Sequence, residues 1–210
     1  NWDTPASFGG PVPGVTPRID AFAAAGHAFE RAHVTVGVCM PSRLALMSGI
    51  YPHRSGADGF LPLRDDVTTL QERLSEAGYR IGILGKKNQM QPAAKFRWDV
   101  AHGGVGPDPL GFGRDPKRYG KECRAFFGES LRAGKPFFLM ANSHDPHRPF
   151  SGSEHEQRYF KEHADSVTPP SRVFSPDEVP AVDWLPDLPE VKRELAQYLS
   201  SARRADDTVG

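Results

Sequence analysis

Cysteine is scarce in this chain: Cys39 and Cys123 are the only two among 210 residues. They lie far apart and show none of the paired spacings of a zinc site, and two cysteines do not make the framework of a small disulfide-rich domain. Long apolar runs are also lacking, since no stretch of 18 apolar residues occurs. We therefore expect no membrane-spanning segment, and the first ten residues show neither the basic nor the apolar region of a secretory signal.

The chain also lacks an excess of charge of either sign, because 26 basic side chains balance 26 acidic ones. A polyanion-binding groove or an acidic tail is not indicated, and we expect no nucleic-acid partner. Glycine (21) and proline (20) are frequent, and they fall between periodic segments without forming a repeat. In a chain long enough for one domain or a large part of one, this composition is typical of an enzyme rich in ordered loops.

Apolar residues at helical spacing, flanked by capping residues, predict five helices. They cover residues 17–25 after Thr16, a segment from about Pro41 to Ser48, residues 70–77 capped by Thr68 or Thr69, residues 119–133, and a last helix beginning near Pro189. Apolar runs predict strands within 79–85 and 135–143, and loose alternation predicts a short strand within 27–36. Glycine and proline argue against regular structure in 91–116, which we interpret as a long surface or lid loop.

This alternation of helices and apolar strands indicates an α/β fold, with a mostly parallel sheet sandwiched between helices. Polar clusters around Cys39, Lys86 and His147 each follow a predicted strand. Ligands of such folds bind beyond the carboxyl ends of the strands, so we expect the three clusters to converge.

Cys39 lies where a strand is predicted to turn into a helix, and the unpaired N–H groups of a helix start favour a thiolate and a bound oxyanion. Arg43 follows about one turn later, and its planar guanidinium suits an anion with tetrahedral oxygens, sulfate or phosphate. For an arbitrary Cys and Arg pair, a buried structural cysteine beside a solvated arginine would be favoured at about three chances in four. The full pattern Cys-x-Pro-Ser-Arg, however, arises by chance on the order of once in a thousand such chains.

The other two clusters have ordinary explanations when each is taken alone. Lys86 and Lys87 could be an exposed pair at a strand end, at roughly even odds. His144 and His147, three residues apart, could be metal ligands or hydrogen-bonding loop residues, with a structural role ahead at about two to one.

The stretch CMPSRLALMSG, which begins at Cys39, resembles the signature of the formylglycine-dependent sulfatases of the alkaline-phosphatase-like superfamily. Three further segments resemble the same family: TPRIDAFAAAGHAFERAHV, GILGKKN and HDPHRPF. The last two, together with LPDLPEVKRELAQYLSSARRADDTVG, are similar to the sulfamidase-like members, the N-sulfoglucosamine sulfohydrolases. The resemblance covers most of the chain and is weakest in the glycine-rich middle.

For Cys39, the resemblance implies oxidation to formylglycine by a formylglycine-generating enzyme, with Pro41 and Ser42 belonging to the signal which that enzyme reads. The hydrated aldehyde has two hydroxyl groups, of which one attacks sulfur and the other later expels sulfate. A serine or thiol ester could not collapse back to an aldehyde by this route, which explains the need for this modification.

Roles for other residues follow from the same resemblance. Arg43 would hold the modified residue, and Lys86 would bind the sulfate and help to neutralise its charge. His147 would contact the sulfate ester and is a candidate acid for the leaving group. His144 and Asp145 would have supporting roles.

The chain departs from the family pattern at two places. The family has a histidine two residues after the sulfate-binding lysine, where this chain has Asn88; an asparagine can still help to position the substrate but cannot transfer protons. Sulfatases also hold a divalent cation, usually calcium, with an Asp pair at the end of the first strand and an Asp-Asn or Asp-His pair far downstream. Neither pair occurs here at its place in the family pattern, so Cys39, as formylglycine, would be the only metal ligand from this chain. We therefore expect residues 1–210 to be part of a single sulfatase catalytic domain, lacking the first strand and the C-terminal part, that folds poorly alone.

The resemblance thus implies a hydrolase of sulfuric esters or sulfamates on sulfated carbohydrates, with Ca²⁺ and formylglycine as cofactors and N-sulfoglucosamine of heparan-type glycans as the favoured unit. One alternative is a phosphoester or phosphonate-ester hydrolase of the same superfamily, which shares the nucleophile and the metal pocket. Another, suggested by Asn88, is a catalytically silent relative that binds glycans. Family habit places such enzymes in the periplasm, outside the cell or in lysosomes, but the sequence itself does not indicate a location.

Overall fold

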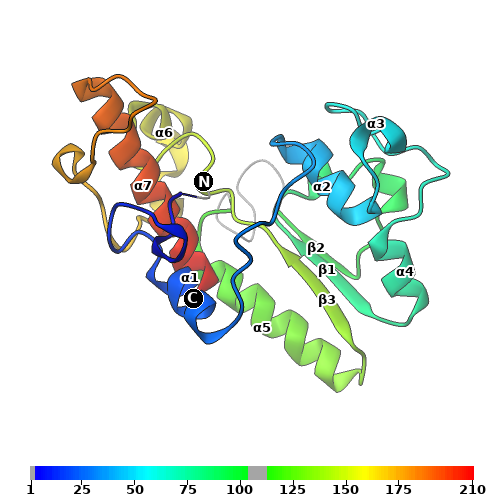
Figure 1. Ribbon diagram of the computed structural model, residues 1–210. Helices are drawn as coiled ribbons and strands as arrows, with labels where there is room; N and C mark the ends of the chain where they lie inside the picture. Colours follow the sequence, from blue (N-terminus) through cyan, green and yellow to red (C-terminus); the bar gives the residue numbers. More distant parts are fainter. Residues whose placement is uncertain (1–2, 104–112) are drawn as a thin grey trace. The chain divides into compact units, whose positions relative to one another are not determined.

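Residues 3–103 and 113–210 are described by the structure, a computed structural model, and they divide into two units (Figure 1). We call residues 31–103 and 121–142 the sheet unit, and residues 3–30, 113–120 and 143–210 the helical unit. The helix α5 (Pro116–Arg132) begins in the helical unit and ends in the sheet unit.

The sheet unit contains three parallel strands in the order β2-β1-β3. The strands are β1 (Arg80–Leu84), β2 (Val100–His102) and β3 (Phe137–Ala141). Gly82, in the middle of β1, lies opposite Val100 on one side and Leu139 on the other. Every residue of β1 after the first is buried, as expected of a central parallel strand that is covered on both faces.

Helices cover the two faces of β1, because successive side chains of a strand point to opposite faces. Ile83 belongs to the same buried apolar cluster as Leu44 and Met47 of α2 (Cys39–Ser48). On the other face, a Cβ atom at Gly82 would lie 2.7 Å from the Phe126 ring of α5, so only glycine fits there. The predicted fold class, a parallel sheet between helices, is confirmed.

Two short helices and two 3-10 turns complete the sheet unit: α3 (Pro52–Ser55), α4 (Leu70–Glu76), η2 (Lys87–Gln89) and η3 (Ala93–Lys95). α4 begins with a reciprocal capping box. Thr69 Oγ1 accepts a hydrogen bond from the Glu72 N–H at 3.2 Å, and the Glu72 carboxylate accepts one from the Thr69 N–H at 2.7 Å. Of the two threonines that the sequence allows as the cap, Thr69 is therefore the one used.

The helical unit is organised around the long helix α7 (Pro189–Val209), whose buried face includes Ala196, Leu199 and Ala202. Its other elements are η1 (Ala6–Phe8), α1 (Pro17–Ala25), α6 (Glu154–Tyr159), η4 (Lys161–Ser166) and η5 (Pro176–Glu178). Among the helices of the described residues, none is long and apolar enough to cross a membrane.

The start of α1 is capped from α7. Thr16 precedes α1 as predicted, but its side chain makes no capping hydrogen bond. The buried carboxylate of Asp206 instead accepts hydrogen bonds from the N–H groups of Arg18, at 3.1 Å, and Ile19, at 2.8 Å. A carboxylate at this position satisfies donors that the helix cannot satisfy itself.

Two predictions about regular structure are wrong. No strand forms within 27–36, all of which is described, because the side chains of 27–35 are exposed and an alternating pattern there buries no face. Within 91–116, where irregular structure is predicted, Val100–His102 forms β2 and Phe96 is buried. A strand of three residues is too short to give a periodic signal. Residues 104–112 of that predicted loop lie outside the described residues.

Candidate functional site

Cys39 is the first residue of α2, two residues earlier than the predicted helix start. Val38 before it is extended, and the first helical hydrogen bond runs from the Ser42 N–H to the Val38 carbonyl at 3.1 Å. Pro41 is tolerated in this first turn because its missing N–H group would have no intrahelical acceptor. Cys39 is half-buried, so its side chain is held at the positive end of a helix while part of it stays accessible.

Arg43, one turn into α2, donates a hydrogen bond from Nη1 to Oδ1 of Asn142. Asn142 is buried and directly follows β3. Its Nδ2 group donates to the carbonyl groups of Leu84 and Gly85, each at 3.1 Å, at the end of β1. Asn142 thus ties the ends of two strands to the guanidinium of Arg43. Sequence reasoning missed this residue, although an amide placed directly after a buried strand could have indicated it.

Lys86 follows the end of β1 in a left-handed backbone conformation, with φ of 58° and ψ of 18°. Within the described residues it is the only residue other than glycine with a positive φ. Such a conformation costs energy for a residue with a Cβ atom, and it is found where function requires a sharp change of chain direction. Lys86 is half-buried and begins the turn η2, which packs against α2. Lys86, the predicted sulfate-binding residue, directly follows Gly85, whose carbonyl group accepts a hydrogen bond from Asn142.

Asn88, the residue that replaces the family histidine, lies in η2 and is exposed. Its backbone carbonyl accepts a hydrogen bond from the Gln91 side chain at 3.0 Å. The side chain of Asn88 is therefore on the surface of the sheet unit, in the same turn as Lys87, and two residues from Lys86.

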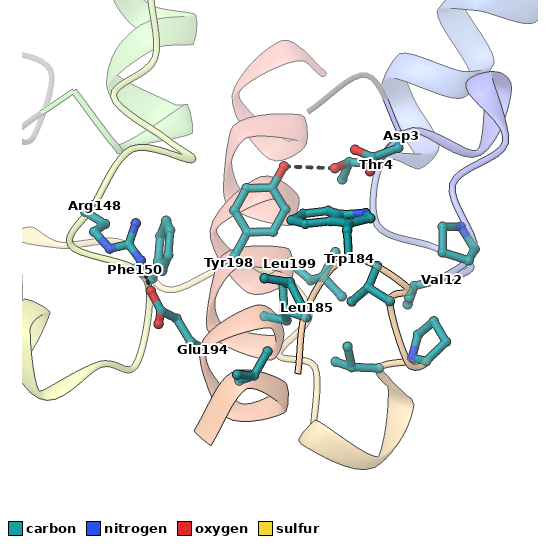
Figure 2. Close-up of a pocket in the computed structure, with 16 residues that line it drawn as sticks. Asp3, Thr4, Val12, Arg148, Phe150, Trp184, Leu185, Glu194, Tyr198 and Leu199 are labelled. Atoms are coloured by element: carbon teal, nitrogen blue, oxygen red, sulfur yellow. Dashed lines mark hydrogen bonds and ion pairs between the residues drawn. The ribbon is translucent and has the colours of Figure 1, made fainter. Parts of the chain in front are cut away.

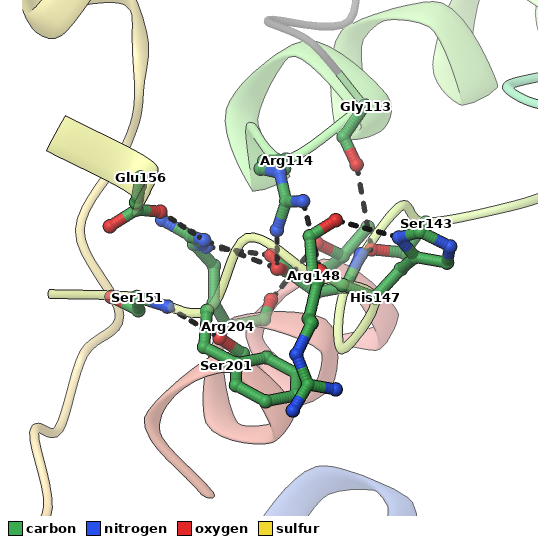
Figure 3. A network of polar contacts seen from close by, with 12 residues as sticks. Gly113, Arg114, Ser143, His147, Arg148, Ser151, Glu156, Ser201 and Arg204 are labelled. Carbon is green, nitrogen blue, oxygen red and sulfur yellow. Dashed lines mark hydrogen bonds and ion pairs between the residues drawn. The ribbon is translucent and has the colours of Figure 1, made fainter. Parts of the chain in front are cut away.

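His147 is an exposed residue in a loop of the helical unit (Figure 3). Its backbone N–H donates to the His144 carbonyl at 2.9 Å, which closes a tight turn. Its ring nitrogen Nδ1 lies 2.6 Å from the Arg148 carbonyl oxygen. A carbonyl oxygen can only accept, so Nδ1 carries a proton and Nε2 is the nitrogen that can exchange one with a ligand.

Beneath this loop, a buried ionic cluster joins Asp145 to two arginines (Figure 3). Arg204 of α7 donates to both carboxylate oxygens of Asp145, from Nε at 2.6 Å and from Nη2 at 3.1 Å. Arg114 donates from Nη1 to Asp145, and Glu156 of α6 accepts from Arg204 at 2.8 Å. Sequence reasoning assigned Asp145 a supporting role but gave no role to Arg114, Glu156 or Arg204.

Burial affects the two arginines differently. The loss of solvent lowers the pKa of Arg114, because it outweighs the attraction of Asp145. Burial acts in the same direction on Arg204, but the contacts with Asp145 and Glu156 outweigh it and raise the pKa of Arg204. Both guanidinium groups are paired with carboxylates, as buried charges must be.

A cavity of about 580 Å³ lies beside α7 in the helical unit (Figure 2). Its lining is mainly apolar and aromatic, and the Arg148–Glu194 ion pair lies at its edge. The Tyr198 hydroxyl is hydrogen-bonded to Thr4 Oγ1 at 2.8 Å within it. None of the predicted site residues lines this cavity, although Arg148 directly follows His147.

The predicted site residues therefore fall into two groups. Cys39, Arg43, Lys86 and Asn88 belong to the sheet unit, whereas His147 belongs to the helical unit. Convergence of the two groups stays a prediction.

A calcium site is not provided by the described residues. They contain no group of three or more His, Cys, Asp or Glu side chains that could hold a metal ion. Calcium takes six or more oxygen ligands, whereas Cys39 offers a single sulfur. The side chains present in this part of the chain therefore do not fit the cation that the resemblance implies.

Comparison with known proteins agrees with these motifs. A family model described as Sulfatase matches residues 1–210. The N-sulphoglucosamine sulphohydrolase of Homo sapiens is 28% identical over 208 residues, which cover 93% of this chain and 41% of that protein. Arylsulfatase A of Bos taurus is 39% identical over 111 residues, which cover 49% of this chain and 18% of that protein.

A solved structure of a 2-O GAG sulfatase is similar in fold, with a TM-score of 0.64 at 19% identity, over 99% of this chain and 50% of that one. The chain thus spans about two fifths of the length of the human relative and half of that solved structure. The family match, however, extends over every residue from 1 to 210. Together with the Cys-x-Pro-Ser-Arg start of α2, this match places the chain in the sulfatase family.

Proposed function

We propose that the protein containing this chain hydrolyses sulfuric esters or sulfamates on sugars, after oxidation of Cys39 to formylglycine. The observation that carries the proposal is the start of α2, where half-buried Cys39 is the first helical residue. Arg43 lies one turn later, and its guanidinium is anchored to the sheet by Asn142. The modified residue would supply the oxygen that attacks sulfur.

The side chains of this chain then have separate tasks. Arg43 orients the modified residue, and Lys86 holds the anionic oxygens of the sulfate group. His147 contacts the ester and carries a proton on Nε2 that passes to the leaving oxygen or nitrogen as its bond to sulfur breaks. The electron pair of that bond stays with the leaving group, so the proton prevents a negative charge from developing there.

The substrate that we favour is N-sulfoglucosamine within a heparan-type glycan. Support comes from the 28% identity, over 93% of this chain, to the human N-sulphoglucosamine sulphohydrolase. A formylglycine-generating enzyme would be the partner that modifies Cys39. A divalent cation, Ca²⁺ by family habit, would be held by the formylglycine at position 39 together with residues other than those described here.

A second candidate is a catalytically silent relative that binds sulfated glycans. The observation in its favour is Asn88, exposed in η2, where the family pattern has a histidine. Asn88→His in the full-length protein separates the two functions, because a gain of hydrolysis argues against a mere binder.

The primary test uses the full-length protein produced together with a formylglycine-generating enzyme. Mass spectrometry of the peptide that contains Cys39 shows whether the thiol has become an aldehyde, and sulfate release is measured from N-sulfoglucosamine and from an aryl sulfate. We expect Cys39→Ala to abolish release, with Cys123→Ala as the matched control. Unchanged turnover in Cys39→Ala would show the mechanism to be wrong, and faster turnover of matched phosphate esters would favour a phosphoester hydrolase.

A further inference from the structure

Asp145 is the centre of the buried cluster beneath His147. Its side chain is 0% exposed, and it accepts a bidentate interaction from Arg204, whose own side chain is 1% exposed. Arg114, at 3% exposed, approaches the same carboxylate from the segment before α5. Asp145, two residues before His147, is therefore held by charged groups from two other parts of the helical unit.

The cluster is balanced in charge, but it is not arranged for the greatest stability. The two guanidinium groups face two carboxylates, Asp145 and Glu156. The Nε atom of Arg114 is nevertheless buried without a hydrogen-bond partner among the described residues. Buried ion pairs seldom stabilise a fold more than apolar side chains of similar volume would, so their presence needs another explanation.

Arg114 connects the cluster to the backbone of His147. Its Nη2 group donates a hydrogen bond to the His147 carbonyl oxygen at 3.0 Å (Figure 3). The same guanidinium therefore binds the Asp145 side chain and the His147 main chain, a geometry that needs a planar group with several donors. The imidazole is attached to a backbone that is held directly at its own carbonyl group.

The residue before Arg114 holds the other end of the same turn. The Gly113 carbonyl accepts a hydrogen bond from the His144 N–H at 2.8 Å. Gly113 has φ of 71°, and a Cβ atom there would lie 2.7 Å from the His144 ring, so only glycine allows this close approach. After the loop, the Ser151 N–H donates to Ser201 Oγ of α7 at 2.7 Å. The turn is thus held before, at and after His147.

We infer that Arg114 and Arg204 are positioning residues, which hold His147 where its Nε2 proton meets the leaving group. Arg204 acts through Asp145, and Arg114 acts through Asp145 and through the His147 carbonyl group. This inference rests on the proposed function of His147 as a proton donor. Neither arginine touches the reacting atoms in this arrangement. Arg204 fixes the Asp145 carboxylate, and Arg114 binds both that carboxylate and the His147 carbonyl group. A small displacement of a proton donor lowers its efficiency strongly, which explains why so much charge is buried beneath one exposed imidazole.

The test compares sulfate esters that differ in their need for a proton donor. An aryl sulfate with an acidic phenol leaves without help, whereas a sugar sulfate or sulfamate needs protonation. In the full-length protein, we expect Arg114→Met and Arg204→Met to lower kcat about tenfold or more for the poor leaving group and to change it little for the good one. Arg193→Met, an exposed arginine of α7, is the matched control and should change neither.

Conservative variants keep the test decisive if the methionine variants fail to fold. Arg114→Lys keeps the charge beside Asp145 but loses the planar fork, so it cannot bind both Asp145 and the His147 carbonyl. We expect it to fold and to show the same selective loss. An equal loss for both leaving groups, or no loss, would mean that the cluster only supports the fold.

His147→Ala separates failure of this inference from failure of the proposed function. If His147→Ala shows no dependence on the leaving group, the proposed role of His147 is wrong. If it does, and Arg114→Lys does not, only the positioning role is wrong. In the double variant Arg114→Lys with His147→Ala, we expect no further loss beyond His147→Ala, because residues that act through one group are not additive.

Discussion

Lys86 combines a strained backbone with a charged side chain at the end of a buried strand. Its φ of 58° lies in the left-handed region, which glycine adopts at little cost but which is unfavourable for a residue with a Cβ atom. The strained conformation turns the chain away from β1 directly after the carbonyl groups that Asn142 binds. Strain of this kind marks positions where the direction of one side chain matters more than stability.

Two substitutions separate the strain at Lys86 from its charge. Lys86→Gly should make the full-length protein more stable than Lys86→Ala by about 1 kcal/mol, because alanine keeps the strained Cβ atom. Both should lose most sulfatase activity, since both lack the amine. Thermal unfolding and sulfate release measure the two effects. Equal stability of the two variants would argue against a strained turn at this position.

Asn142 binds both the end of β1 and the guanidinium of Arg43, so one substitution affects both contacts. Asn142→Ala removes the acceptor for Arg43 and the side-chain donor to the buried Gly85 carbonyl, whereas the Leu84 carbonyl keeps the Asn142 backbone N–H as a donor. We expect a loss of about 1–3 kcal/mol in stability and a lower kcat/KM, because the guanidinium is no longer held. Urea unfolding and steady-state kinetics provide the measurements, with Asn88→Ala, an exposed amide, as the control for stability. A variant that retains both full stability and full kcat/KM would show that this anchor is unimportant.

At the scale of elements, the sequence predicts those structures whose signals are local. α1, α4 and α7 begin next to the predicted residues, because caps and N-terminal prolines act within one turn. β2 escapes prediction, since three residues followed by glycines carry no period and their pairing with β1 depends on distant residues.

The candidate site divides in the same way. Short motifs predict Cys39, Arg43, Lys86 and His147. In the structure Cys39 begins α2, Arg43 lies one turn into it, and Lys86 and His147 lie in tight turns. Arg204, in contrast, lies 59 positions from Asp145, and nothing in the local pattern of α7 distinguishes it from the neighbouring Arg203. Burial selects one arginine of that pair, and burial is a property of the assembled unit.

The capping box of α4 predicts a pH-dependent stability. Burial tends to raise the pKa of Glu72, but hydrogen bonds from the N–H and hydroxyl groups of Thr69 outweigh it and lower the pKa of Glu72. A depressed carboxyl pKa stabilises the folded state at pH above the unfolded value, and this contribution disappears as the pH falls through the folded pKa. Thr69→Ala should therefore cost about 1 kcal/mol near neutral pH and less at about pH 3.

Urea unfolding at both pH values measures this difference. Thr68→Ala provides the matched control, because the adjacent threonine is exposed and is not the N-cap. A cost of Thr69→Ala that stays the same at both pH values would contradict a role for the ionised Glu72 carboxylate.

At the scale of the whole molecule, the chain itself limits how far the two groups of site residues can separate. Asn142, which anchors Arg43, is the last residue of the sheet unit, and His147 follows five positions later in the helical unit. Five residues span at most about 18 Å even when fully extended. The turn closed by the His147 N–H and the His144 carbonyl shortens this reach further. Convergence of the two groups stays a prediction, and variants that combine substitutions from the two units can test it.

Convergence makes a prediction about how variants from the two units combine. If Lys86 and His147 act on one sulfate group, the Lys86→Ala/His147→Ala double variant of the full-length protein should be about as slow as the slower single variant. Groups that act at separate sites would multiply their losses instead. Lys86→Ala combined with Arg193→Met provides the control pair, since Arg193 is an exposed residue of α7 in the same unit as His147. The measurement is kcat/KM for a sugar sulfate. If the losses of the Lys86 and His147 variants multiply, the two residues belong to different sites, and the group around Cys39 lacks its proposed proton donor.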